Sequence, residues 1–349
     1  MSDGQFEPTS VELVLLGNAI IGLEATCDEA LLRRVTEMTD VTRAGSHLVE
    51  ADRLDEICRD VARFSTILPQ PGGSAANTAA GLSALGVATE FIGVVGADPL
   101  GDMFRADFEN RGVRFRTAAA ISHPTGRCLV LVSPDAERTM LCHLGAASCL
   151  DVSYVRTDAV SSAKMTFVEG YLWQSERSKA AAEMAITITR CASRSVALSL
   201  SDVACVRANS SEFLRLIQDG YIDIVFGNKA EFMELVQKKD LTSVIGYLVT
   251  LHSTAAFAVT LGARGSVVIK GGHAHGIPAY PARRVVDTTG AGDAFAAGFM
   301  HGVLSRHDLV TCAQNGSFCA AKIVSQLGTR PSKSVKHEMR QLKKKLADP

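Results

Sequence analysis

Residues 286–295, VDTTGAGDAF, combine two glycines with small and hydroxyl side chains at the start of an apolar helical pattern. Glycines at such a turn let backbone amides converge where the helix begins, and the positive end of the helix dipole makes that place an anion site. Asp293 falls in the first helical turn, beside this site. Its carboxylate could accept the proton of an attacking hydroxyl while the amides stabilise developing phosphoryl charge. The alternative is that Asp293 only complements the dipole, but the two glycines and the preceding Asp-Thr pair favour the catalytic interpretation.

A second glycine-rich turn lies at residues 72–82, GGSAANTAAGL, where a helix of small residues again follows the glycines. Ser74 and Asn77 are about one helical turn apart, so both side chains can face one ligand. The structural alternative is a tightly packed helix in which Ser74 is the cap and Asn77 is buried. From this segment alone the two interpretations are equally supported.

Length, composition and charge exclude several classes of protein. The chain has 349 residues with 36 basic and 37 acidic side chains, a formal net charge of −1. This balance gives no electrostatic footprint for nucleic acid or for an anionic membrane. No apolar run reaches the roughly 18 residues of a membrane span, and the first residues lack the pattern of a secretory signal. The nine cysteines show no C-x-x-C spacing, which favours small buried side chains in a reducing cytoplasm over a zinc site or a disulfide framework.

Short apolar runs alternate with helix-like stretches along most of the chain. This rhythm predicts an α/β fold with a central, mostly parallel sheet that has helices on both faces. Two stretches, Val41–Glu50 and Val113–Leu144, contain strand-like runs without a long helix between them. The second includes a hairpin pattern, Arg127–Val132 followed by Arg138–Leu141. We expect these stretches to form a small accessory sheet over the main one.

The two glycine-rich turns resemble the two signature regions of the PfkB carbohydrate kinase family, also called the ribokinase-like superfamily. Three further segments resemble family motifs in the same order: residues 17–21 (GNAII), 228–231 (NKAE) and 259–265 (VTLGARG). The opening segment and residues 134–140 (PDAERTM) are most similar to adenosine kinases and their bacterial sugar-kinase relatives. The resemblance implies a ribokinase-like three-layer fold, one domain over residues 1–349, with a β-sheet lid formed by about 22–50 and 113–144. The P-loop and dinucleotide-binding patterns are absent from the sequence.

The resemblance also implies an activity and a set of roles. The chain would be a cytoplasmic, ATP-dependent kinase that moves the γ-phosphate to a hydroxyl of a sugar or nucleoside, with Mg²⁺ as cofactor. A homodimer formed through the lid is a candidate assembly. The implied site residues are Asp293 as general base; Gly290, Ala291 and Gly292 as anion hole; Asn228 and Glu231 for phosphates and Mg²⁺, Glu231 through water; Thr260, Gly262 and Gly265 for the nucleotide; Asn18, Gly72, Gly73, Ser74 and Asn77 for the acceptor; and Arg138 reaching from the lid to the transferred phosphate.

One position departs from the family pattern. Four residues after Asn18, where the family usually has an aspartate that binds two sugar hydroxyls, this chain has Gly22. If the segment is extended, Glu24 lies on the same face as Gly22 and could take over that contact. Two functions therefore stay open: a phosphotransferase, favoured because the Asp293 site is complete, and a catalytically silent or altered-specificity nucleotide- or sugar-binding relative, favoured by Gly22.

Overall fold

The structure is a computed structural model and describes residues 10–347 except 40, 44, 136 and 333. In this part of the chain one sheet has eight strands, in the spatial order β13-β12-β11-β10-β9-β8-β1-β5. Neighbouring strands from β5 to β11 are parallel, and β12 and β13 continue the sheet antiparallel. The strands are β1 (Leu13–Leu16), β5 (Thr89–Ile92), β8 (Met165–Glu169), β9 (Ser195–Ser199), β10 (Ile224–Asn228), β11 (Ala256–Thr260), β12 (Ser266–Lys270) and β13 (His273–Ile277).

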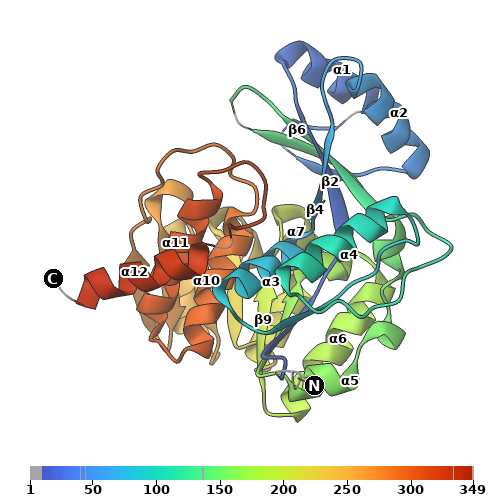
Figure 1. Ribbon diagram of the computed structural model, residues 1–349. Coiled ribbons are helices and arrows are strands. Elements are labelled where there is room, and N and C mark those ends of the chain that lie inside the picture. The colour runs from blue at the N-terminus through green and yellow to red at the C-terminus, as the bar shows by residue number, and fades with distance from the viewer. Residues whose placement is uncertain (1–9, 40, 44, 136, 333, 348–349) are drawn as a thin grey trace, which may run out of the picture.

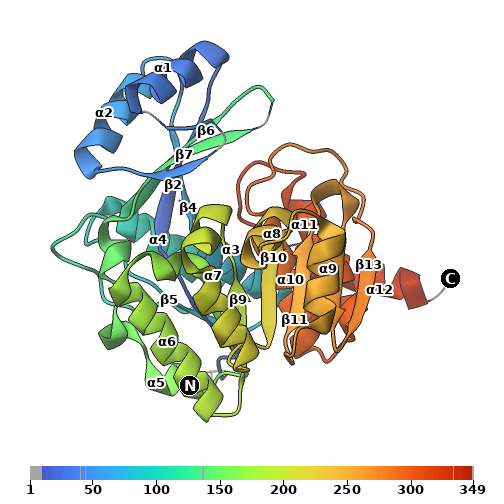
Figure 2. The same ribbon diagram turned by 180° about the vertical axis from the view of Figure 1, so that it is seen from behind.

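Helices cover both faces of this sheet, so the predicted fold class is confirmed (Figures 1 and 2). One face carries α3 (Ser74–Leu85), α4 (Pro99–Arg111), α10 (Ala291–Leu304) and α11 (Leu309–Ile323), with α12 (Val335–Ala347) packed outside them. The other carries α5 (Thr157–Ser162), α6 (Glu176–Cys191), α7 (Val203–Gln218), α8 (Lys229–Leu235) and α9 (Leu241–Thr250). The parallel strands are apolar on both faces because each face packs against helices. None of the described helices is long and apolar enough to cross a membrane.

A second, smaller sheet stands above the carboxyl edge of the large one (Figure 1). Its order is β3-β7-β6-β2-β4. Helices α1 (Glu29–Thr39) and α2 (Ala51–Val61) cover its outer face, where their leucines and valines pack against the sheet. We call this unit, the sheet with α1 and α2, the lid. Its strands are β2 (Ile20–Thr26), β3 (Ser46–Leu48), β4 (Leu68–Gly72), β6 (Gly126–Val132) and β7 (Arg138–His143).

The lid differs in detail from the sequence-based expectation. The hairpin of β6 and β7 lies where the pattern indicated it, but the stretch Val41–Glu50 supplies only the three-residue strand β3. Strand β4 joins the lid from outside the two expected segments, and its prolines at 69 and 71 conceal its strand character in the sequence. Residues 113–120 run along the large sheet and touch it through isolated bridges rather than entering the lid. The division of the chain into one domain with a lid stays a prediction.

Close packing of α10 against α11 generates a test of this architecture. A Cβ added at Gly298 of α10 would lie 2.5 Å from the backbone oxygen of Asn315 in α11, so the helices would have to separate. We expect Gly298→Ala to lower the free energy of unfolding by about 1–3 kcal/mol. Gly246 is the matched control, because it is an exposed glycine within α9 with open space around its Cβ position. Gly246→Ala should raise the free energy of unfolding by about 0.5–1 kcal/mol. Urea unfolding of both variants measures whether this free energy falls for Gly298→Ala and rises for Gly246→Ala.

Candidate active site

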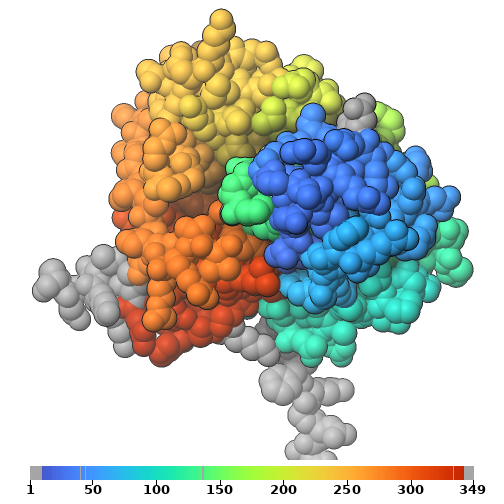
Figure 3. Space-filling view, turned by 90° about the horizontal axis from the view of Figure 1, so that it is seen from above, coloured from blue at the N-terminus to red at the C-terminus, as the bar shows by residue number. Residues whose placement is uncertain are grey.

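A cavity of about 280 Å³ lies between the lid and the carboxyl edge of the large sheet. Figure 3 looks down on the lid and shows the hollow between it and the C-terminal part of the chain. We call it the acceptor cavity. Its lining includes Asp293 and five of the residues predicted to hold the acceptor: Asn18, Gly72, Gly73, Ser74 and Asn77. Thr289, which was not predicted, lines it as well. These residues come from segments far apart in the sequence, and parallel strands bring them together because their carboxyl ends share one edge.

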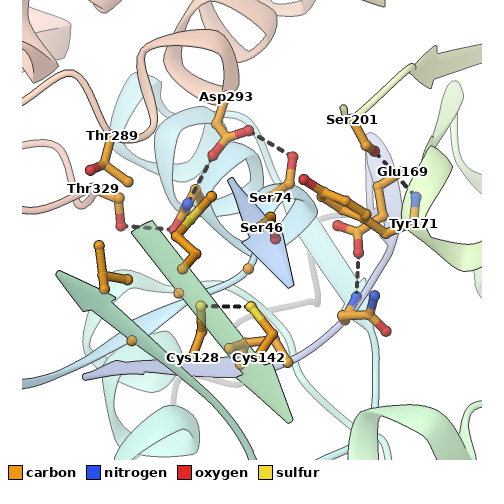
Figure 4. A pocket seen from close by; sticks show the side chains of 18 of the residues that line it. Ser46, Ser74, Cys128, Cys142, Glu169, Tyr171, Ser201, Thr289, Asp293 and Thr329 are labelled. Atoms are coloured by element: carbon orange, nitrogen blue, oxygen red, sulfur yellow. Dashed lines mark hydrogen bonds between the residues drawn. The ribbon is translucent and has the colours of Figure 1, made fainter. Parts of the chain in front are cut away.

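The Asp293 carboxylate points into this cavity from the first turn of α10 (Figure 4). The Ser74 hydroxyl donates to Oδ1 at 2.7 Å, and the Asn77 amide donates to Oδ2 at 2.8 Å. Burial raises the pKa of Asp293 above that of an ordinary aspartate, and the two hydrogen bonds oppose this increase because they stabilise the charged form. The arrangement presents an oriented carboxylate to whatever occupies the cavity, and a raised pKa makes proton acceptance by this carboxylate more favourable.

Two glycines shape the helix starts on either side of the carboxylate. Gly73, at the N-cap of α3, has a φ of 97°, and a Cβ there would collide with the backbone oxygen of Asn18. Gly290, at the N-cap of α10, has a φ of 73°. Among the described residues, the amides of Gly292 and Asp293 have no hydrogen-bond acceptor, as expected for the first turn of a helix. These amides and the helix dipole make the turn before Asp293 able to bind an anion.

The C-terminal segment after α11 supports Asn77. The Thr329 hydroxyl and the Arg330 guanidinium each donate to Asn77 Oδ1 at 2.9 Å, which fixes the amide so that its nitrogen faces Asp293. Arg330 also pairs with Asp107 of α4 at 3.0 Å. Burial lowers the pKa of Arg330 to about 10, so it keeps its charge at neutral pH. The sequence analysis missed both residues, because nothing near Gly328 resembles a site motif and the contact spans more than 250 positions.

Glu169 is a second group that the sequence analysis missed. It ends β8 and is fully buried, yet it lines the acceptor cavity. Its carboxylate accepts from the backbone amides of Asn18 at 2.7 Å and Ala75 at 2.8 Å, so it ties the end of β1 to the start of α3. Burial raises the pKa of Glu169 to about 7, against the effect of these two bonds. The available signal was a carboxylate that ends the apolar run MTFVE just before a glycine.

Arg138 connects the lid to the turn before α10. It forms an ion pair with Asp287 and donates to the Thr288 hydroxyl at 3.0 Å. The Asp287 carboxylate is buried and also accepts from the amide of Thr289 at 2.7 Å and that of Gly328 at 3.2 Å. Arg138 therefore lies against the loop of the expected anion site rather than on the wall of the acceptor cavity.

A second cavity, of about 530 Å³, lies on the other side of residues 288–292. We call it the nucleotide cavity. Its lining brings together the predicted nucleotide residues Thr260, Gly262 and Gly265 with Ala291 and Gly292. Apolar and aromatic side chains complete the wall, among them Tyr280, Val285, Phe295, Ala320 and Val324. A Cβ at Gly292 would meet no atom within 4 Å, so the glycine leaves that end of the cavity open.

Asn228 and Glu231 form a capping box at the start of α8. Asn228 Oδ1 accepts from the Glu231 amide at 3.0 Å, and Glu231 accepts from the Asn228 amide at 2.9 Å and from its side chain. Burial raises the pKa of Glu231 to about 8. The pair lines neither of the two cavities. Across the described residues, no group of three or more His, Cys, Asp or Glu side chains is arranged to hold a metal ion.

Gly22 and Glu24 lie on the face of β2 that lines the acceptor cavity. A Cβ at Gly22 would meet only the backbone oxygen of Gln70, at 3.5 Å, so the space above this glycine is open. The Glu24 carboxylate is half-buried, and this burial raises its pKa while Arg138 opposes the increase. The cavity wall thus has a gap at Gly22 and a carboxylate two residues farther along the strand.

Comparisons with known proteins agree with this architecture. The family model of the pfkB family carbohydrate kinases matches residues 38–336. The solved structure of adenosine kinase from Sinorhizobium meliloti is 36% identical, with a TM-score of 0.89 and coverage of 96% of this chain and 100% of that one. A probable sugar kinase from Rhizobium etli CFN 42 is 34% identical, with a TM-score of 0.89 and coverage of 96% and 99%.

A curated relative extends the similarity to archaea. The uncharacterized sugar kinase of Archaeoglobus fulgidus is 27% identical over 256 residues, which cover 72% of this chain and 96% of the relative. Because the family match extends over most of the sequence and both solved kinases align with nearly all of it, this chain belongs to the pfkB family of carbohydrate kinases.

Proposed function

We propose that this protein transfers the γ-phosphate of ATP to a hydroxyl of a sugar or nucleoside, with Asp293 as the general base. One observation carries the proposal: the turn before α10 separates two cavities and contributes to both. Thr289 and Asp293 line the acceptor cavity, whereas Thr288, Ala291 and Gly292 line the nucleotide cavity. A phosphoryl group bound at this turn would lie between a nucleotide on one side and an acceptor on the other, which is the arrangement that direct transfer needs.

The residues divide the chemistry as follows. Asp293 accepts the proton of the acceptor hydroxyl, while Ser74 and Asn77 hold the carboxylate in orientation. The amides at the start of α10 stabilise charge on the transferred group. The lid, tied to the same turn through Arg138, excludes water that would otherwise compete as acceptor. The relatives include an adenosine kinase and a probable sugar kinase, so the acceptor class proposed is a sugar or nucleoside.

Mg²⁺ is part of the proposal, and Glu231 is the residue that would hold it, through water. Mg²⁺ keeps several waters, so a carboxylate that lines neither cavity and already accepts two hydrogen bonds from Asn228 would act on the ion only through water. Bound with the nucleotide, Mg²⁺ would neutralise charge on the phosphates. Asn228 would position Glu231, because it occupies both oxygens of that carboxylate in the capping box.

The second function kept open is binding without catalysis, and Gly22 is the observation that favours it. Position 22 itself offers no group that could bind a pair of hydroxyls, and the carboxylate on this face of β2 is that of Glu24, two residues farther along the strand. A homodimer through the lid and a cytoplasmic location also stay predictions. Since α1 and α2 cover the outer face of the lid sheet, such a dimer would have to use the edge strands β3 and β4 or these helices.

Replacing the base tests the main proposal. We expect Asp293→Asn to lower the turnover rate by roughly 10²–10⁴-fold, because the amide keeps the shape of the carboxylate but cannot accept a proton. ATP affinity should stay near that of the wild type, since Asp293 does not line the nucleotide cavity. Kinase assays with a panel of sugars and nucleosides, combined with calorimetric ATP binding, measure both quantities. Wild-type turnover in this variant would reject the role of Asp293, and the absence of turnover in the wild type across the panel would favour the silent relative.

The metal role of Glu231 can be separated from its capping role. Glutamine also completes a capping box, so Glu231→Gln can keep the bond with the Asn228 backbone amide, although its NH₂ group cannot accept the second bond, from the Asn228 side chain. We expect the Mg²⁺ concentration that gives half-maximal activity to rise roughly 10- to 100-fold, as for other groups that act on a metal indirectly. A thermal melt provides the control for folding. If the Mg²⁺ dependence of the variant matches that of the wild type, Glu231 has no part in metal binding.

Restoring a carboxylate at position 22 tests how the cavity recognises its acceptor. We expect Gly22→Asp to tighten binding of vicinal-diol acceptors about tenfold or more, because each hydrogen bond to a charged group contributes about 1.5–3 kcal/mol. Gly22→Asn, which has the same shape without the charge, is the matched control and should gain less. Dissociation constants of ribosides in one buffer decide the matter. Weaker binding of the aspartate variant would mean that Glu24 already fills that place, and unchanged binding would mean that position 22 does not face the acceptor.

A further inference from the structure

Two cysteines face each other in the wall of the acceptor cavity. Cys128 of β6 and Cys142 of β7 are register partners on the antiparallel hairpin of the lid, and both line the cavity. Their sulfur atoms lie 2.6 Å apart, within hydrogen-bonding distance of each other (Figure 4). Both cysteines are free thiols, and each has the other as a hydrogen-bonded neighbour.

The hydrogen-bond pattern of the hairpin puts the two cysteines at a position of closest approach. The Ser133 amide donates to the Glu137 oxygen at 3.0 Å, which makes this a hydrogen-bonded pair of the antiparallel hairpin. Hydrogen-bonded and non-hydrogen-bonded pairs alternate along such a hairpin, and in this register Cys128 and Cys142 form a non-hydrogen-bonded pair. In agreement, the Cys142 oxygen is occupied from the other side, by the Val49 amide at 2.9 Å. Such non-bonded pairs have the shorter Cα separation, about 4.5 Å, which lies in the range that a disulfide spans.

The local environment favours reaction at Cys142. Cys142 is partly exposed to the cavity, whereas Cys128 is buried. The hydrogen bond between the two thiols lowers the pKa of Cys142 against the effect of burial, and Ser46 acts in the same direction as that bond. By contrast, burial raises the pKa of Cys205 and that of Cys319 to about 12, which leaves those thiols unreactive. Cys142 is therefore an accessible thiol with increased thiolate character, and Cys128 is placed to resolve its oxidised form.

We propose that Cys128 and Cys142 form a reversible disulfide in the wall of the acceptor cavity when the protein meets a hydroperoxide, and that this bond weakens acceptor binding. The Cys142 thiolate attacks one peroxide oxygen, the O–O bond breaks, hydroxide leaves, and Cys142 becomes a sulfenic acid. Cys128 sulfur then attacks Cys142 sulfur; the S–S bond forms, the S–O bond breaks and water leaves. Two thiols are oxidised by two electrons in total, and hydrogen peroxide is reduced to two waters.

The effect on the acceptor rests on the proposed function, but formation of the bond does not. The disulfide removes the thiol groups from the cavity wall and joins β6 to β7 covalently. The same hairpin carries Arg138, which holds the lid against the turn before α10. We expect the dissociation constant of the acceptor to rise about threefold or more, the size of effect that loss of one ordinary hydrogen bond produces.

Peptide mapping tests formation of the bond on the full-length protein. The protein is treated with hydrogen peroxide, alkylated and digested, and the expected product is a cross-linked peptide that contains Cys128 and Cys142 and disappears on treatment with a thiol reductant. Cys142→Ser should abolish it, and Cys128→Ser should leave a sulfenic acid that dimedone traps at Cys142. Cys191→Ser, which removes the exposed surface thiol, is the matched control and should keep the cross-link. Absence of the cross-linked peptide from the oxidised wild type would overturn the proposal.

Binding measurements test the consequence. Oxidised and reduced wild type are compared for affinity toward an acceptor found in the kinase panel and toward ATP, whose cavity contains neither cysteine. Weaker acceptor binding that a reductant restores, with ATP binding unchanged, is expected. If the disulfide forms and acceptor affinity stays unchanged, the proposal that this bond weakens acceptor binding is wrong. If the panel yields no acceptor, the proposed function fails, and the peptide map still decides whether this disulfide forms.

Discussion

Asp293 lies in the first turn of α10, and its carboxylate lines the acceptor cavity. Its two hydrogen-bond donors, Ser74 and Asn77, lie in the first turn of another helix, α3. A carboxylate removed from water must be hydrogen-bonded, so this interaction requires α3 and α10 to place their first turns side by side. The packing below permits this, because a Cβ at Gly81 of α3 would lie only 2.8 Å from that of Ala297 in α10. The positions of the Asp293 carboxylate, of the amides beside it and of Ser74 and Asn77 all depend on that one close approach of two helices.

Further links extend this constraint to the rest of the molecule. Asn77 is held by Thr329 and Arg330, and Arg330 reaches α4 through Asp107. Glu169, in the same cavity wall, joins the end of β1 to the first turn of α3 through two backbone amides. The carboxylates are therefore oriented by backbone amides and by side chains whose own partners are fixed, which is how a site keeps its geometry while the groups within it change charge.

Much of the main sheet was predictable because local pattern and tertiary environment agree there. A buried parallel strand must be apolar on both faces, and the runs at β1, β8 and β9 appear plainly in the sequence. The lid was less predictable. Strand β3 has three residues, β4 contains two prolines, and the outer face is made of the amphipathic helices α1 and α2 rather than strands. The roles of Glu169, Thr329 and Arg330 were beyond reach for another reason: each depends on a contact with a segment more than 90 positions away, and no local spacing reports such a contact.

The lid and the anion site share a single network. Asp287 accepts from the amides of Thr289 and Gly328 and pairs with Arg138, so one buried carboxylate contacts the turn before α10, the C-terminal segment and the lid. If the Arg138 contact broke, the buried Asp287 carboxylate would lose its ion pair and keep only its hydrogen-bond donors, which would cost free energy. This cost favours the conformation in which the lid contacts the turn. A charged group that binds at the turn would change the electrostatic free energy of this Asp287–Arg138 pair. We therefore expect the position of the lid and the occupancy of the anion site to be coupled through Asp287, and the proposed disulfide in the β6–β7 hairpin would act on an element that takes part in that coupling.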